Sequence, residues 1–304
     1  MKTAIREINT INELHRIREL GKPSHPLISL VDYADVKHYA SDNHVNWIQN
    51  FYSIAMKKNI QGKMRYGHRE YDFDEGLMSF LAPKQALNVI VEQGDENKSG
   101  WILFIHPDFI WNTSLAKSIK QYEFFDYAIS EALFLSKKEE QIMQTIFLNI
   151  QQEIAANIDD FSQNIIISQI ELLLSYSQRF YKRQFITRKK CSHQVLEKLE
   201  ELLNTYFDDI YGDHKGLPSV QFVAEHLNMS PTYLSGLLKS LTGLSTQQHI
   251  HLKIIDKAKE RLSTTELSIS EIAYELGFEH VQSFSKFFKN KTDQSPLEFR
   301  ALFN

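Results

Sequence analysis

The strongest constraint on the fold is a stretch of sequence that occurs twice near the C-terminus, 50 residues apart. "YLSGLLKSLTGLS" begins at Tyr233, and "SFSKFFKNKTDQS" begins at Ser283. In both copies two apolar residues precede a lysine, Lys239 or Lys289, and a threonine and a serine follow at equal distances. Because internal repeats reveal architecture, this one predicts two copies of a single structural unit.

A short helix with its own stop signal precedes each copy. Ala224 is followed four residues later by Asn228, and Ala273 four residues later by Gly277. Two helices that meet at a steep angle need a small residue where they touch. They also need a residue that tolerates left-handed backbone angles where the first helix ends. The pattern therefore predicts two helix-turn-helix units.

One continuous helix is expected between the two units. The segment "TQQHIHLKIIDKAKERL" lies between Gly243 and Ser263. It is long enough for a helix of about 17 residues, or roughly 25 Å. A rigid rod of that length holds two helix-turn-helix units about one DNA turn apart, roughly 34 Å. Both second helices could then enter successive major grooves on one face of DNA.

Residues 217–303 resemble the DNA-binding domain of the AraC/XylS family of bacterial transcription regulators. The resemblance rests on "LNMSPTYLSGLLKSLTGLS", "KAKERL", "SISEIAYELGF" and "SFSKFFKNKTDQSPLEFR". It implies a sequence-specific regulator that binds double-stranded promoter DNA and contacts RNA polymerase. The chain departs from the family pattern at four positions. Leu238 replaces a usual aromatic residue, Asp293 replaces a usual glycine, and Gly236 and Lys253 stand where arginine is common.

A recognition helix reads bases with its outward N-terminal residues. The base-reading candidates in the two units are Thr232, Ser235 and Gly236, then Val281, Gln282, Ser283 and Lys286. Glutamine suits adenine, lysine suits guanine, and valine can meet a thymine methyl group. Gly236 offers no side chain, so we expect the second unit to discriminate more strongly between sequences.

Other residues of the repeat suit different roles. The phosphate-contact candidates are Lys239, Lys289 and Lys291, which position a protein on DNA without reading its sequence. The aromatic residues Phe284, Phe287 and Phe288 are expected to pack in the core. The net charge of −4 gives no sign of nucleic-acid binding, so only the distribution of charge can favour DNA.

The segment from about Val45 to Ile110 predicts a different architecture. Its short β-branched or aromatic runs, separated by glycine, proline and polar turns, are typical of an antiparallel barrel or sandwich. By the same family resemblance, "GKMRYGHREYDFDEG" and "GLMSFLAPKQALN" are similar to a cupin-type regulatory domain. The expected fold class is α+β, with an N-terminal antiparallel cupin-like barrel and helical hairpin and a C-terminal all-α double helix-turn-helix domain.

The ligand set of a metal cupin is incomplete in this chain. The first motif supplies His68, Glu70 and Glu75, and Asn88 stands near the position of a further histidine. Two of three expected histidines are missing, so we expect no metal and no other cofactor. A barrel of this kind can hold a small effector. Candidates for its lining, most of which also read as plain core, are Trp47, Phe51, Tyr66, His68, Tyr71 and Trp101.

Two alternatives to an effector-controlled regulator remain open at this point. One is a cupin metalloenzyme with an accessory DNA-binding module, which the missing histidines disfavour. The other is a DNA-binding protein that responds to no effector. The first alternative predicts bound metal, and the second predicts a DNA affinity that no small molecule changes. We expect that the chain is not an enzyme.

Two long amphipathic segments follow the strand-rich region. "SKKEEQIMQTIFLNIQQEIAANI" and "FSQNIIISQIELLLSYSQRFYKRQF" carry apolar residues at helical spacing. They predict an antiparallel hairpin with an apolar face that could form a homodimer. The stretch 179–190 is basic and is read as a solvated linker or as a neighbour of a phosphate backbone.

The expected division of the chain has three parts. Residues 1–125 form the cupin-like sensor, 126–190 the dimerisation hairpin and linker, and 191–304 the DNA-binding domain. The single cysteine, Cys191, excludes an internal disulfide framework. The N-terminus lacks the apolar segment of a signal peptide, and no apolar run reaches the roughly 18 residues of a membrane span. The sequence therefore predicts a cytoplasmic protein without a membrane partner.

Overall fold

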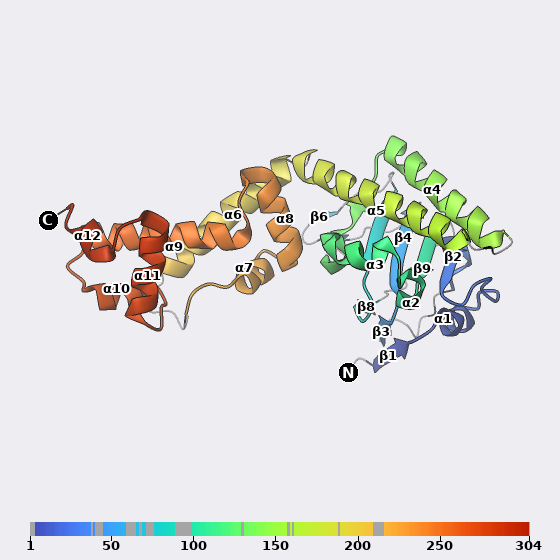
Figure 1. The fold of residues 1–304 in the computed structure, drawn as a ribbon. Coiled ribbons are helices and arrows are strands. Elements are labelled where there is room, and N and C mark those ends of the chain that lie inside the picture. The colour runs from blue at the N-terminus through green and yellow to red at the C-terminus, as the bar shows by residue number, and fades with distance from the viewer. Residues whose placement is uncertain are drawn as a thin grey trace. The chain divides into compact units, whose positions relative to one another are not determined.

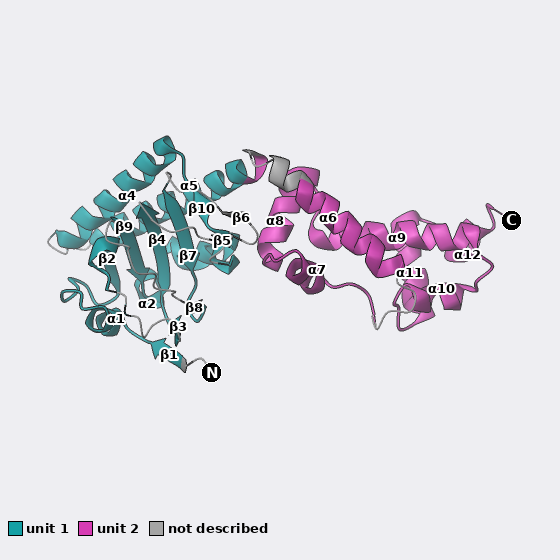
Figure 2. Cartoon of the chain, turned by 180° about the vertical axis from the view of Figure 1, so that it is seen from behind, with its two compact units in different colours: residues 1–184 teal, residues 185–304 magenta. Residues whose placement is uncertain are grey.

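The computed structural model describes most of the chain in two compact units, residues 1–184 and 185–304 (Figure 2). The described residues are 4–37, 39, 45–58, 65–66, 69–70, 76–88, 99–128, 131–156, 159, 161–187, 189–208 and 216–303. The helical hairpin belongs to the same unit as the N-terminal sheets, and the three-part division stays a prediction.

The first unit contains an antiparallel five-stranded sheet in the order β10-β7-β4-β9-β2. Its strands, in that order, are Leu133–Phe134, Leu77–Leu81, Tyr52–Lys58, Ser99–Ile105 and Ile28–Asp32. In the centre of the sheet Ile54 lies opposite Phe80 on one side and Leu103 on the other. All three side chains are buried, as expected for a central strand flanked by apolar neighbours.

A smaller sheet has the order β1-β3-β8. Its strands are Ala4–Ile8, Val45–Gln49 and Ala86–Asn88, and a separate pair joins β5, Arg65–Tyr66, to β6, Arg69–Glu70. β1 pairs with β3 in parallel, whereas β3 and β8 are antiparallel. The antiparallel strands confirm the coarse fold class. No described strand joins the two larger sheets by hydrogen bonds, so the described strands form no closed cupin-like barrel.

The long helices α4 (Lys137–Ala155) and α5 (Ser162–Thr187) lie along one face of the five-stranded sheet (Figure 1). Helix α1 (Ile11–Ile17) packs on the other face, in an apolar cluster with Ile102 and Phe104. The first unit also contains α2 (Pro107–Ile110), α3 (Ser114–Ser118) and short 3-10 turns at Tyr33–Asp35, Ile119–Gln121 and Glu123–Asp126. Helix α4 begins with a capping box formed by Ser136 and Glu139. The two long amphipathic segments thus form α4 and α5, as predicted.

The C-terminal end of α5 is bonded to α4 and β10. Arg183 donates from Nε to Glu139 Oε1 at 2.7 Å and from Nη2 to the Phe134 carbonyl oxygen at 2.6 Å. Gln184 accepts from the Phe134 amide at 2.8 Å and donates to the Ala132 carbonyl oxygen at 3.2 Å. Arg183, which belongs to the basic stretch, is therefore engaged within the first unit.

The second unit is entirely helical in its described residues. Its helices are α6 (Lys189–Asp208), α7 (Val220–His226), α8 (Pro231–Thr242), α9 (Thr246–Thr264), α10 (Ile269–Glu275), α11 (Val281–Thr292) and α12 (Pro296–Arg300). The 19-residue α9 confirms the continuous helix expected between the two repeats. Its length is roughly 28 Å, so the two helix-turn-helix units lie along one rigid helix of that length.

Two ion pairs fix α9 to its neighbours. Lys257 on α9 lies 2.6 Å from Asp208 at the end of α6. Arg261, one turn further on, lies 2.9 Å from Glu275 of α10. The Arg261–Glu275 pair is largely screened from solvent, so its loss would leave a poorly solvated charge. These ion pairs hold α9 against α6 and α10, and Leu262, next to Arg261, is buried.

Candidate nucleic-acid interface

Both predicted turns adopt the backbone geometry that their sequences require. Asn228 has φ 54° and Gly277 has φ 91°, so each first helix ends in the left-handed conformation. The amide after each turn residue bonds back to the alanine carbonyl, from Met229 to Ala224 and from Phe278 to Ala273, at 2.9 Å in both cases. Both alanines are fully buried where the helices touch. The two helix-turn-helix units are therefore confirmed.

The two second helices, α8 and α11, also end alike. Gly243 and Asp293 adopt left-handed angles of φ 78° and 61° at equivalent positions. Thr242 and Thr292 each donate a side-chain bond to the carbonyl four residues earlier, at 2.9 and 2.8 Å. The sequence repeat is thus a structural repeat that extends through the helix ends.

The aromatic residues of α11 divide between core and surface. Phe284 and Phe288 are fully buried, which confirms their expected packing role. Phe287 is only half-buried and contacts the edge of the His251 ring, with centroids 5.1 Å apart. Phe287 is one residue before Phe288, so the helical turn places it at the border of the core.

The outward faces of the two second helices differ in their side chains. On α11, Gln282, Ser283 and Lys286 are exposed and Val281 is half-buried. On α8, Thr232, Ser235 and Gly236 are all half-buried. The arrangement brings each set of candidates onto one helix end, with the longer polar side chains on the second helix.

The phosphate-contact candidates are available for binding. Lys239, Lys289 and Lys291 are exposed near the C-terminal ends of the same helices. Within the residues that the structure describes, Lys239, Lys286 and Lys291 form no ion pair with a carboxylate. Exposed cations without carboxylate partners are what a DNA backbone requires.

Two histidines of α9 lie between the helix-turn-helix units. Burial lowers the pKa of His251, and the positive charge of Lys291 lowers it further. Burial also lowers the pKa of His249, although the nearby Glu200 carboxylate acts in the opposite direction. Both imidazoles are therefore held towards the neutral form in the folded protein.

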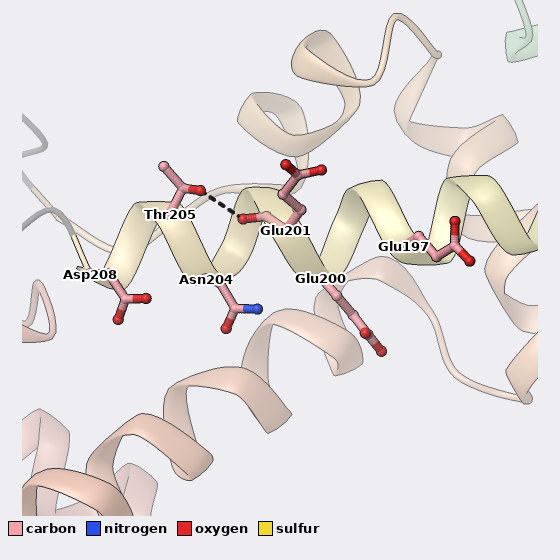
Figure 3. A pocket seen from close by; sticks show the side chains of 6 residues that line it. All are labelled: Glu197, Glu200, Glu201, Asn204, Thr205 and Asp208. Carbon is pink, nitrogen blue, oxygen red and sulfur yellow. Dashed lines mark hydrogen bonds between the residues drawn. The ribbon is translucent and has the colours of Figure 1, made fainter.

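A shallow acidic concavity lies on α6 (Figure 3). Its lining consists of exposed residues of one helix: Glu197, Glu200, Glu201, Asn204, Thr205 and Asp208. Four of these six carry carboxylates, which repel the phosphates of DNA. The concavity therefore does not belong to a DNA-binding surface, and the side of the unit formed by α8 and α11 is the candidate interface.

The N-terminal candidates are only partly brought together. Trp47 and Phe51 are buried in one apolar cluster with Ile102 and Phe104 of β9. Trp101 precedes Ile102 on the same strand and so points to the opposite face, where it stacks on Phe147 of α4. Trp101 therefore does not share an interior with Trp47.

The remaining pocket and metal candidates lie where the structure gives no description. His68, Tyr71 and Glu75 lie outside the described residues, as do the side chains of Tyr66, Glu70 and Asn88. Within the described part of the chain, no three histidine, cysteine, aspartate or glutamate residues form a metal-binding group. The absence of a metal stays a prediction.

The sequence reasoning missed one buried polar group beside Trp47. Gln49 is buried two residues further along β3, on the same face of the strand. Among the residues that the structure describes, neither Trp47 Nε1 nor Gln49 Oε1 has a hydrogen-bond partner. The guanidinium of Arg18 lies over the Trp47 ring, 4.8 Å from its centroid. The alternation of β3 was the signal that could have identified Gln49 as an interior residue.

Comparison with known proteins also identifies helix-turn-helix units in the C-terminal part of the chain. Residues 223–302 match a family model described as a helix-turn-helix domain. A helix-turn-helix-type transcriptional regulator of Bacillus subtilis, YfiF, is 26% identical over 287 residues, covering 88% of this chain and 83% of the relative. The arabinose operon regulatory protein of Escherichia coli is 39% identical over 79 residues, covering 26% of this chain and only 27% of that protein.

A solved structure matches about a third of this chain. The C-terminal domain of the response regulator yesN from Fusobacterium nucleatum is 30% identical, with 35% of this chain and 98% of that chain covered and a TM-score of 0.31.

No described helix is long and apolar enough to cross a membrane.

The matched turns and the family match define a helix-turn-helix DNA-binding protein. More narrowly, the chain is a helix-turn-helix transcriptional regulator whose C-terminal unit carries an AraC-type domain.

Proposed function

We propose that α8 and α11 enter successive major grooves of promoter DNA, and that the second helix supplies most of the sequence preference. The observation that carries this proposal is the pair of matched helix-turn-helix units on the single 19-residue helix α9. A rod of about 28 Å is close to the spacing of one DNA turn. Gln282 and Lys286 are long, exposed and polar, whereas Thr232 and Gly236 are short.

A base-substitution series across both half-sites at fixed salt tests this division. Gln282→Ala and Lys286→Ala should each weaken specific binding by about 1–3 kcal/mol and relax the preference at one position. Lys239→Ala should weaken binding to every sequence and flatten the salt dependence, because it removes a phosphate contact. The proposal fails if the first half-site is the more discriminating, or if Lys286→Ala leaves the preference unchanged.

We also propose that a small effector binds in the N-terminal unit between its two larger sheets. The unpartnered Trp47 Nε1 and Gln49 Oε1 support this, since buried polar atoms without partners are costly. Gln49→Leu removes one of these atoms. It should raise the stability of the unit by about 1 kcal/mol and abolish any effector response in DNA binding. A variant that loses stability while keeping the response contradicts the assignment.

We further propose a homodimer formed through α4 and α5. Ile165 and Leu172 on α5 are exposed, lie seven residues apart and so share one face of the helix. Ile165→Glu and Leu172→Glu should each shift the sedimentation of the full chain from dimer to monomer. The matched control is Leu252→Glu, at an exposed leucine of the second unit. A wild-type monomer would refute the dimer.

Regulation at a promoter would bring the bound protein against RNA polymerase, which we propose as its second macromolecular partner.

The alternative function, a cupin metalloenzyme, predicts about one bound metal ion per chain. Elemental analysis of the purified full-length protein distinguishes the two, because a regulator without a metal site should contain less than a tenth of an equivalent of zinc, iron or manganese.

A further inference from the structure

Five of the six helices α7 to α12 begin with the same device. The N-cap of each is a serine whose hydroxyl accepts a bond from the backbone amide three residues later, and these serines are Ser219, Ser230, Ser245, Ser268 and Ser295. Such a bond satisfies one of the free amides at the start of a helix. The unit therefore uses a serine cap as its regular helix start.

The second recognition helix, α11, is the exception. Its N-cap is His280, which makes no side-chain cap bond. The imidazole is exposed and has no hydrogen-bond partner within the described residues. Only the backbone of His280 takes part in the helix start, since its carbonyl oxygen accepts from the Ser283 amide at 3.0 Å. The side-chain cap bond is thus absent at the helix end that the proposed function places in the major groove.

The structural repeat allows His280 to be compared with the equivalent residue of the first helix-turn-helix unit. His280 occupies the position of Ser230 in the first unit, just as Gln282 occupies that of Thr232 and Lys286 that of Gly236. At each of these positions the second unit carries a longer hydrogen-bonding side chain than the first. The phosphate-contact candidate Lys239, by contrast, recurs as Lys289. The exchange at His280 therefore resembles those at the base-reading candidates Gln282 and Lys286 rather than the unchanged phosphate contact.

We propose that His280 is a third base-reading residue of α11, and that its imidazole N–H donates a hydrogen bond to N7 of a purine in the major groove. This inference rests on the proposed placement of α11 in DNA. An imidazole carries one N–H donor in its neutral form, and N7 is an acceptor that guanine and adenine share. The bond therefore selects purine over pyrimidine at one position, next to the base pairs read by Gln282 and Lys286.

The decisive variant is His280→Ser, which restores the cap used by the other five helices. It should raise the melting temperature of the second unit by about 2–6 °C, because a serine cap stabilises a helix start. It should also weaken binding to the preferred DNA site roughly three- to tenfold, as expected for one lost hydrogen bond. His280→Ala, which has neither cap nor imidazole, should weaken DNA binding equally without the gain in melting temperature.

The contact itself is tested with DNA in which purines of the second half-site are replaced one at a time by 7-deaza analogues, which lack N7. Wild-type protein should lose three- to tenfold in affinity at one replaced purine, and His280→Ser should lose nothing further there. Unchanged affinity of His280→Ser for the preferred site overturns the inference. A loss of equal size on every sequence, with a weaker salt dependence, overturns it too, because that result identifies a phosphate contact.

The same measurements separate this inference from the function on which it rests. Wild-type protein that shows no difference between sequences in the second half-site refutes the proposed placement of α11. Wild-type protein with a clear preference there, combined with a silent His280→Ser variant, refutes only the role of His280. As a matched control, Ser230→Ala in the first unit should lower the melting temperature and leave the preference in the second half-site unchanged.

Discussion

Gly277 packs directly against the backbone of Gly216. A Cβ atom at Gly277 would lie well inside contact distance of the Gly216 carbonyl oxygen, and φ at Gly277 is 91°. The same carbonyl oxygen accepts a 2.9 Å bond from the Tyr206 hydroxyl of α6. The turn of the second helix-turn-helix is therefore locked to the segment that follows α6, for which only glycine leaves room.

Gly277→Ala should consequently destabilise the second unit by roughly 2–3 kcal/mol, since it combines backbone strain with a backbone clash. Asn228→Gly is the matched control at the first turn and should change stability by less than about 0.5 kcal/mol. Hydrogen exchange of peptides from α10 and α11 reports the loss. Tryptophan fluorescence serves as an internal reference, because all three tryptophans, Trp47, Trp101 and Trp111, belong to the first unit. Equal effects at the two turns would contradict the argument.

Asp293→Gly should stabilise the second unit. Asp293 holds a left-handed angle of φ 61° where the first unit has Gly243 at φ 78°. Glycine adopts this conformation without the strain of a Cβ, so we expect a gain of about 0.5–1 kcal/mol. The reverse change, Gly243→Asp, should cost a similar amount. Thermal unfolding followed by circular dichroism measures both, and a loss of stability in Asp293→Gly would exclude this explanation.

Arg183→Gln should destabilise the first unit and leave DNA binding unchanged. The change removes the bond to the buried Glu139 and the bond to the Phe134 carbonyl oxygen. A cost of roughly 1–3 kcal/mol follows, because Glu139 then keeps a poorly solvated charge. Urea unfolding followed by tryptophan fluorescence measures it. Arg179→Gln, at an exposed neighbour, is the control. A lower salt dependence of DNA binding in Arg183→Gln would instead indicate a phosphate contact.

The second unit should lose stability in mild acid through His249 and His251. Both have a pKa below the ordinary histidine value in the folded state. Below about pH 6.5 the unfolded chain therefore binds protons before the folded one, so the free energy of unfolding falls as the pH drops through the folded-state pKa values. Lys291 and Phe287 face His251, and Thr242 and Glu200 face His249.

Comparison with His249→Gln/His251→Gln measures this contribution. The double variant should show a shallower loss of stability between about pH 6.5 and 5 than the wild type, in hydrogen exchange of α9 and α11 peptides. Parallel curves would mean that the two histidines do not contribute. Burial also lowers the pKa of His25 in the first unit, and both the wild type and the double variant contain His25. Tryptophan fluorescence, which reports on the first unit, should therefore change with acid in the same way in the two proteins.

The helix-turn-helix pair could be predicted from local sequence signals. Alanine and a glycine or asparagine four residues later, serine caps and the apolar spacing of α8 and α11 are local signals. Each acts within one or two helical turns, so the chain carries it regardless of what packs around it. The buried Phe284 and Phe288 follow from the same periodicity. For this reason the DNA-binding domain could be recognised from the sequence before its structure was known.

How distant segments combine could be learned only from the three-dimensional fold. The parallel pairing of β1 with β3, the position of Trp101 on the face opposite Trp47, and the bonds of Arg183 within the first unit all join residues far apart in the chain. Local patterns leave such pairings open, because sheet register and face depend on which strands meet. Likewise, only the fold shows that Trp47 Nε1, Gln49 Oε1 and the His280 imidazole have no hydrogen-bond partner among the described residues.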